Sequence, residues 1–235
     1  MFKGKESFAL TDAQRPESID VHRRKFLKYA GYAGVAGIIL TGCTPEVLGD
    51  PNSPQDAVNL GSGDIGILNY AYALEQLEAA FYTKVVATPF AGINQMEASL
   101  IKDVRDHEIA HREFFKNALG SNAIGQLEFD FSSVNFNSRD SVLATSKAFE
   151  DLGVSAYNGA GRLLQSATYL TLAGKIVSVE ARHAAFFRDL ISFGSFSDEV
   201  VNAQGLDTSR KPKEVLAIAD PYIITEINAD NLPTY

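Results

Sequence analysis

The sequence predicts an all-α protein whose folded part is a four-helix bundle made of two antiparallel helix pairs. Three observations lead to this prediction. Four long segments repeat apolar residues at helical spacing. The connection inside each pair is short, whereas a longer stretch, residues 120–140, joins the two pairs as a crossover. Finally, glutamates recur in the four segments as two alternating signatures.

Residues 1–42 have the pattern of an export signal. Arg23 and Arg24, followed by Lys-Phe-Leu-Lys, resemble the twin-arginine export motif, although a histidine precedes them in place of the usual serine or threonine. An uncharged 14-residue stretch follows and is too short to span a bilayer comfortably. It ends in Leu-Thr-Gly before Cys43, which resembles the lipobox of bacterial lipoproteins. We therefore predict twin-arginine export, lipidation of Cys43 and a position on the periplasmic side of a membrane. The alternative is an uncleaved leader with an incidental cysteine.

The charge of the chain argues against binding to nucleic acid. The formal net charge is −8, and residues 1–42 contain 7 of the 21 Lys and Arg but only 4 of the 29 Asp and Glu. Without those residues the chain would carry a net charge of −11. Nucleic-acid recognition needs clustered Lys and Arg that face phosphates.

The folded part is expected to span residues 64–193. Before it, residues 43–63 are rich in Pro, Gly, Asn and Asp, which predicts a tether. After it, residues 194–235 contain three prolines and predict an extended tail that wraps the bundle. Asp64 is the expected N-cap of the first helix and Gly120 the expected end of the second. The four predicted helices cover residues 64–86, 95–119, 141–160 and 168–193.

Residues 61–66 match the G-x-G-x-x-G fingerprint of dinucleotide-binding proteins. That function requires a strand before the glycines and a βαβ unit around them. Here the tether precedes them and no parallel strands are predicted after them, so we expect a loop that leads into the first helix.

Residues 107–111 form H-E-x-x-H, the signature of zinc metalloproteases. A zinc protease needs a third ligand and an open water position beside a substrate cleft. After residue 42 the only other histidine is His183, which belongs to a repeat, although a glutamate would also serve as third ligand. The protease is therefore the least favoured interpretation. We expect His107 at the surface or boundary of its helix.

The second and fourth segments share the motif E-x-x-H-x-x-F-F, formed by Glu108 and His111 in one and by Glu180 and His183 in the other. The position that matches His107 is Val179, so His107 is not part of the repeat. Residues three apart share a helix face, so each Glu and His project together. The phenylalanines are expected to pack in the core and keep the site dry; they are Phe114, Phe115, Phe186 and Phe187.

The first and third segments share a glutamate followed seven residues later by a tyrosine: Glu75 with Tyr82, and Glu150 with Tyr157. Seven residues place the tyrosine about 10 Å along the axis from its glutamate. Each tyrosine would therefore hydrogen-bond a metal-binding carboxylate of the facing helix. Glu78 lies one turn beyond Glu75 and could face either the site or a neighbouring helix. We choose Glu75 because the second pair repeats its spacing to the tyrosine.

Four glutamates turned into one core would bring about four negative charges into a low dielectric. Two divalent cations would cancel that charge. A Glu from each of two helices and Glu-x-x-His from each of the other two form the known ligand set of di-iron and di-manganese bundles. We therefore predict a dinuclear centre held by Glu75, Glu108, His111, Glu150, Glu180 and His183.

The chain resembles ferritin-like domain proteins, and among them the bacterial and plant group often labelled desiccation-related. Four stretches within about residues 60–195 carry this resemblance: LNYAYALEQLEAAFY, RDHEIAHREFF, FEDLGVSAYNGAG and IVSVEARHAAFF. It implies a ferritin-like four-helix bundle that binds two Fe or two Mn ions, with zinc still able to compete. The implied activities are oxidation of Fe(II) by dioxygen or peroxide, and removal of peroxide, as in a ferroxidase, peroxidase or catalase. The alternative is a non-catalytic envelope protein of stress or desiccation that only binds metal. A membrane tether argues against a closed 24-subunit storage shell, whereas a homodimer is compatible with it.

Overall fold

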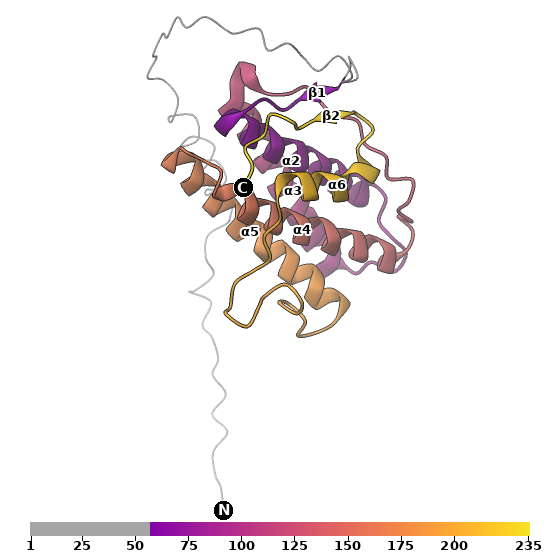
Figure 1. Cartoon of the computed structure of the whole chain (residues 1–235). Helices are drawn as coiled ribbons and strands as arrows, with labels where there is room; N and C mark the ends of the chain where they lie inside the picture. The colour runs from indigo at the N-terminus through magenta and orange to yellow at the C-terminus, as the bar shows by residue number, and fades with distance from the viewer. Residues whose placement is uncertain (1–56) are drawn as a thin grey trace, which may run out of the picture. The chain divides into compact units, whose positions relative to one another are not determined.

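The computed structural model describes residues 57–235, so the predicted export signal, with Arg23, Arg24 and Cys43, lies outside the described residues. Four long helices form an all-α bundle (Figure 1). Their bounds lie within two residues of the predicted ones: α2 is Gly63–Ala87, α3 is Gln95–Leu119, α4 is Arg139–Gly161 and α5 is Ala167–Ile191. Helix α2 packs along α3, and α4 packs along α5. The predicted fold class is therefore confirmed.

Side-chain caps explain where three of these helices begin. Asn94 and Glu97 form a capping box at the start of α3, in which the Asn94 side chain accepts a hydrogen bond from the Glu97 amide at 2.9 Å. Ser138 caps α4 by accepting a hydrogen bond from the Ser141 amide, and Ser166 caps α5 by accepting one from the Tyr169 amide. The predicted N-cap of the first helix is wrong. Ser62 occupies that position, and the Asp64 carboxylate instead accepts hydrogen bonds from the amides of Gln165 and Ser166, just before α5.

The crossover between the helix pairs is held by two buried amide side chains of α2. Asn69 donates to the carbonyls of Leu60 and Asn122 and accepts from the amide of Ile124. About two turns further on, Gln76 donates to the Gly125 carbonyl and accepts from the Leu127 amide. Because the backbone polar groups of this irregular segment need partners, the two side chains supply them and fix the segment against the bundle.

The C-terminal segment differs from the predicted extended tail, because it contains regular structure. It includes helix α6 (Pro212–Ala219), a 3-10 helix η3 (Asp220–Tyr222) and strand β2 (Ile227–Asn228). Proline at the first position and Glu214, which accepts a hydrogen bond from the Lys211 amide at 3.1 Å, favour this helix start. Helix α6 packs against α4 and buries Val215 and Ala219 fully.

The last residues of the predicted tether belong to the folded domain. Strand β1 (Val58–Asn59) pairs in parallel with β2, and the next residue, Leu60, is fully buried. A strand therefore does precede the G-x-G-x-x-G loop and has a parallel partner, contrary to the prediction. Each strand has only two residues, however, and the described chain contains no βαβ unit around this loop. The loop leads into α2 as expected.

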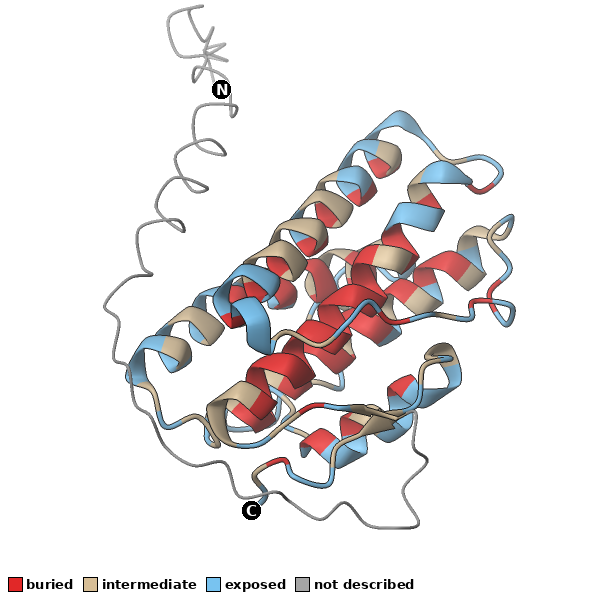
Figure 2. Cartoon of the chain, turned by 90° about the horizontal axis from the view of Figure 1, so that it is seen from above, coloured by how far each residue is buried: buried red, intermediate tan, exposed pale blue. Residues whose placement is uncertain are grey.

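Buried residues line the helix sides that face one another, as the red segments of Figure 2 show. Helix α2 is the most enclosed, because most of its length is covered on all sides. Of the phenylalanines predicted to pack in the core, Phe115 and Phe187 are buried, whereas Phe114 and Phe186 are only half-buried. Within residues 57–235, no helix combines the length and apolar character needed to cross a membrane.

Gly159 in α4 gives a test of how the C-terminal segment packs. A Cβ at this position would lie 1.7 Å from the carbonyl oxygen of Arg210, whose amide donates to the Ser155 carbonyl at 3.0 Å. We expect Gly159→Ala to reduce the free energy of unfolding by about 3 kcal/mol, because the backbone at Arg210 must move away to make room for the methyl group. Thermal unfolding and protease sensitivity after residue 205 measure this. The control is Gly174→Ala in α5, where a Cβ meets nothing within 4 Å and helix propensity improves by about 1 kcal/mol. Equal stability of the two variants would contradict this packing.

Candidate metal centre

Six side chains from the four long helices converge inside the bundle. The glutamates are fully buried, and the histidines are 8% and 6% exposed. They form two groups of four residues whose ligand atoms lie within 4.8 Å of one another, so that each group could hold a metal ion. The first group is Glu75, Glu108, His111 and Glu180; the second is Glu108, Glu150, Glu180 and His183. The structure thus brings together all six residues that the sequence predicts as ligands.

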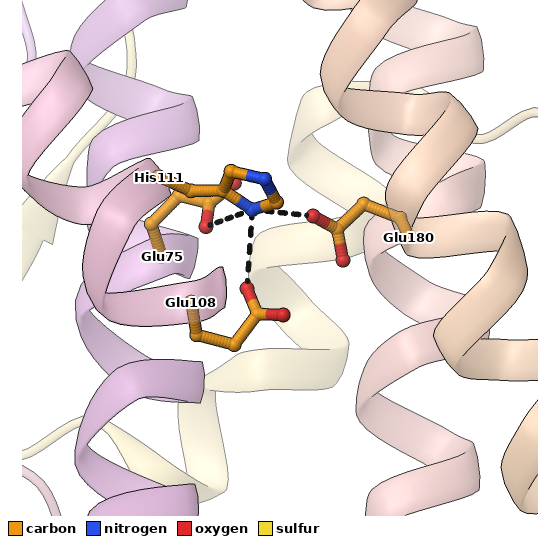
Figure 3. Close-up of side chains that lie close together, drawn as sticks. All are labelled: Glu75, Glu108, His111 and Glu180. Atoms are coloured by element: carbon orange, nitrogen blue, oxygen red, sulfur yellow. Dashed lines mark ion pairs between the residues drawn. The ribbon is translucent and has the colours of Figure 1, made fainter. Parts of the chain in front are cut away.

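The first group is arranged around Nδ1 of His111 (Figure 3). This nitrogen lies 2.8 Å from Oε1 of Glu180 on α5. It also lies 3.5 Å from Oε2 of Glu75 on α2 and 3.5 Å from Oε2 of Glu108, one turn earlier on α3. Three helices therefore direct carboxylate oxygens at one imidazole.

The second group repeats this arrangement around Nδ1 of His183. This nitrogen lies 2.8 Å from Oε1 of Glu108, 3.3 Å from Oε2 of Glu150 and 3.7 Å from Oε2 of Glu180. Here the unshared glutamate comes from α4 instead of α2. The two helix pairs therefore contribute in the same way, as expected from the sequence repeat.

Two of the glutamates belong to both groups. Glu108 presents Oε2 to His111 and Oε1 to His183. Glu180 presents Oε1 to His111 and Oε2 to His183. Each of these carboxylates thus offers one oxygen to each group, which is the arrangement that a carboxylate bridge between two cations requires.

The other two glutamates each share one oxygen with a tyrosine of the facing helix. The Tyr82 hydroxyl on α2 donates to Oε1 of Glu150 at 2.6 Å, and the Tyr157 hydroxyl on α4 donates to Oε1 of Glu75. Oε2 of each glutamate remains directed at a histidine. The structure contains both cross-helix hydrogen bonds that the sequence spacing predicts. Burial, followed by the neighbouring carboxylates, raises the pKa of both tyrosines well above the ordinary value, so both stay protonated donors.

The polar atoms of the centre fit a cation better than they fit one another. Eight buried nitrogen and oxygen atoms of these six residues have no hydrogen-bond partner. Nδ1 of His111 lies only 2.8 Å from Oε1 of Glu180, yet neither atom has a hydrogen-bond partner. Unpaired buried carboxylates are costly, and oxygen and imidazole nitrogen are the ligands of divalent cations such as Fe²⁺ and Mn²⁺.

The pKa values in the absence of metal show the cost of burying these unpaired carboxylates. Burial raises the pKa of Glu75 and that of Glu150 to about 8, even though a nearby histidine opposes the shift in each case. Burial alone would lower the pKa of His183, but Glu150 and the other carboxylates raise it to about 12. Burial would likewise raise the pKa of Glu180, but the two imidazoles lower it to about 2. Protons therefore neutralise part of the cluster when no metal does.

Glu78, whose direction the sequence left open, is buried but belongs to neither group. Its carboxylate faces Gly153 on α4, where a Cβ would lie 3.1 Å from Oε1. Burial, followed by the charges of the ligand glutamates, raises the pKa of Glu78 well above its ordinary value. Burial thus favours the neutral form of Glu78, and the structure places Glu75, not Glu78, in a group of potential ligands.

His107 does not join either group of potential ligands. It lies exposed on α3, as expected, and its Nδ1 lies 2.9 Å from Nε2 of His183 on α5. The two histidines of H-E-x-x-H therefore do not converge on one point, as a zinc protease requires. The contact with His183 could not be predicted from local spacing, since the two histidines are 76 residues apart.

Comparison with known proteins agrees with this architecture. A family model described as a ferritin-like domain matches residues 63–192, which covers all four long helices and all six residues of the centre. No curated protein matches this sequence.

Proposed function

Since the chain belongs to the ferritin-like domain family, we propose that it binds two iron or two manganese ions and uses them for redox chemistry with dioxygen or peroxide. One observation carries this proposal. Glu108 and Glu180 each direct one oxygen at each histidine, so two cations would share both carboxylates. A structural site for one ion needs no such sharing.

Each residue of the centre has a distinct role in this proposal. Glu108 and Glu180 would bridge the ions, with Glu75 and His111 completing one site and Glu150 and His183 the other. When bound, the two ions would supply electrons to an O–O bond and charge to stabilise the reduced oxygen. The tyrosine hydroxyls hold Glu75 and Glu150 in place, which keeps their free oxygens directed inward.

The apolar surroundings support redox chemistry in a site from which water is excluded. Phe187 is fully buried and its ring stacks on Tyr82 at a centroid distance of 5.7 Å. On the other side, Phe115 lies 6.4 Å from Tyr157. These rings cover the two tyrosine–glutamate pairs and strengthen the electrostatic interactions inside the centre.

The ligand set favours iron or manganese. Four carboxylates and only two imidazoles, with no thiolate, suit these metals, although affinity order alone would let zinc compete. Metal analysis of protein purified from supplemented medium, combined with Fe(II) oxidation and peroxide turnover, tests the proposal. Two iron or manganese ions per chain with turnover are expected. Protein that stays free of metal and inactive under these conditions would refute it.

A second candidate function is non-catalytic, in envelope stress or drying, and the buried charge of the centre favours it. Metal binding would neutralise that charge and stabilise the bundle whether or not any reaction follows. A large rise in melting temperature with Mn(II) or Fe(II) but no turnover supports this role. A rise with turnover supports the redox role.

We further propose that the chain is exported by the twin-arginine route and anchored to a membrane through Cys43. This route carries folded proteins and so permits metal loading before export. The negative net charge argues against a nucleic-acid partner, and we propose a homodimer as the form in which the chain associates with itself. Cell fractionation of the wild-type protein and of the Cys43→Ser variant tests the anchor. We expect the wild-type protein in the membrane fraction and the variant in the soluble fraction, and a soluble wild-type protein would refute the anchor.

A further inference from the structure

His107 makes a directed contact with one residue of the metal centre. Its Nδ1 lies 2.9 Å from Nε2 of His183, the ring nitrogen that faces away from the carboxylates. The ring planes are inclined by only 8° and the ring centroids are 5.2 Å apart. At this separation the two nitrogens lie between the rings, so that the N–H of one is directed at the lone pair of the other. The contact therefore has the geometry of a hydrogen bond and not of face-to-face stacking.

Among residues 57–235, this contact occurs on only one side of the centre. In the repeat of α3 and α5, the position that matches His107 is Val179. A valine side chain has no donor or acceptor to offer His111 in the way that His107 serves His183. No other histidine is available among residues 57–235, which contain only His107, His111 and His183. The two groups of potential ligands, otherwise equivalent, therefore differ at this contact.

The contact between His107 and His183 determines which nitrogen of His183 can bind a metal ion. Nδ1 of His183 faces Glu108, Glu150 and Glu180, so this nitrogen is the one that would bind an ion. Nε2 must then keep its proton, and an acceptor at Nε2 fixes both the tautomer and the direction of the ring. Nδ1 of His107 is placed to be that acceptor.

We propose that His107 is a positioning residue that holds His183 in its metal-binding orientation and makes the His183 site the tighter of two unequal sites. This inference rests on the proposed function. It gives the first histidine of H-E-x-x-H, although exposed, a role other than that of a protease ligand. The two ions would then bind in sequence, with the His183 site filled first.

The test uses Co(II) as probe metal and isolates each site by removing its unshared glutamate. In Glu75→Ala protein only the His183 site remains, and adding His107→Leu is expected to weaken its Co(II) affinity by about 10–100-fold. In Glu150→Ala protein only the His111 site remains, and His107→Leu is expected to change nothing. His107→Gln, whose amide oxygen also accepts a hydrogen bond, should restore most of the affinity and the Co(II) absorption spectrum.

Equal Co(II) affinity with and without His107→Leu in the Glu75→Ala protein would overturn the inference. A readout without metal separates this outcome from failure of the proposed function. In the metal-free protein, the Nε2–H proton of His183 should give a protected, downfield NMR resonance that His107→Leu removes. If the wild-type protein binds no metal, the proposed function fails while this resonance still reports the contact. If the resonance is missing from the wild-type protein, His107 does not hold His183.

Discussion

Glu180→Ala is expected to remove both metal ions from the protein, whereas Glu75→Ala is expected to remove only one. The reason is that Glu180 belongs to both groups of potential ligands, whereas Glu75 belongs to only one. Glu180 directs Oε1 at His111 and Oε2 at His183, 2.8 Å and 3.7 Å away, so its loss takes a ligand from both sites. Glu75 directs one oxygen at His111 only, because its other oxygen accepts from Tyr157.

The same distinction applies to the other half of the centre. Glu108→Ala should behave like Glu180→Ala, and Glu150→Ala like Glu75→Ala, with the remaining ion at the opposite site. Native mass spectrometry of Mn(II)-loaded protein counts the ions directly. The matched control is Glu113→Ala on α3, since Glu113 pairs with Arg112 at the surface and should leave two ions bound.

Catalysis should follow the ion count. A pair of cations is needed to deliver two electrons to one O–O bond, so all four ligand variants should lose at least about 100-fold in Fe(II) or peroxide turnover. If Glu180→Ala still binds one ion as tightly as Glu75→Ala does, the carboxylate does not bridge. The centre would then be two independent sites.

The helices and the potential ligands could be predicted from the sequence because both depend on local periodicity. Apolar spacing identified α2 to α5, and the repeated intervals between Glu, His and Tyr identified the six ligand positions and the two tyrosines. Each of these signals lies within one helix. Packing four such helices by apolar faces then brings the polar positions on those faces together.

Features that depend on how distant segments meet were not predictable in this way. Whether a glutamate bridges or serves one site depends on helix rotation, so spacing alone could not distinguish Glu108 from Glu75. The contact of His107 with His183 and the pairing of β1 with β2 join residues far apart in the chain. Asp64 was misassigned for the same reason, because its carboxylate accepts from amides about 100 residues away and not from its own helix.

The metal-free protein is expected to lose stability as the pH rises from 5.5 to 7.5, the opposite of what ion-paired carboxylates cause. Burial raises the pKa of Glu75 and Glu150 from 4.5 to about 8, so between these values the folded state binds more protons than the unfolded state. Stability then falls with rising pH. The raised pKa of His183 acts in the same direction above pH 6.5. The lowered pKa of Glu180 acts oppositely, but only below pH 4.5.

The size of this effect makes it measurable by thermal unfolding. One extra proton bound by the folded state corresponds to about 1.4 kcal/mol per pH unit. For a domain of this length that is roughly 3–5 °C per pH unit, so the melting temperature should fall by at least about 6 °C between pH 5.5 and 7.5. The Glu75→Gln, Glu150→Gln double variant removes two of the titrating groups and should make the fall shallower, while Glu78 and His183 keep part of it.

Saturating Mn(II) should reverse the trend, because the ion takes the place of the protons on the same oxygens and nitrogens. Metal binding releases those protons, so the stabilisation by Mn(II) should grow as the pH rises through 7.5. The same six side chains thus destabilise the empty bundle and stabilise the loaded one. If the melting temperature of the metal-free protein instead rises between pH 5.5 and 7.5, the glutamates are already ionised at low pH. Their burial would then not be what prepares the centre for two cations.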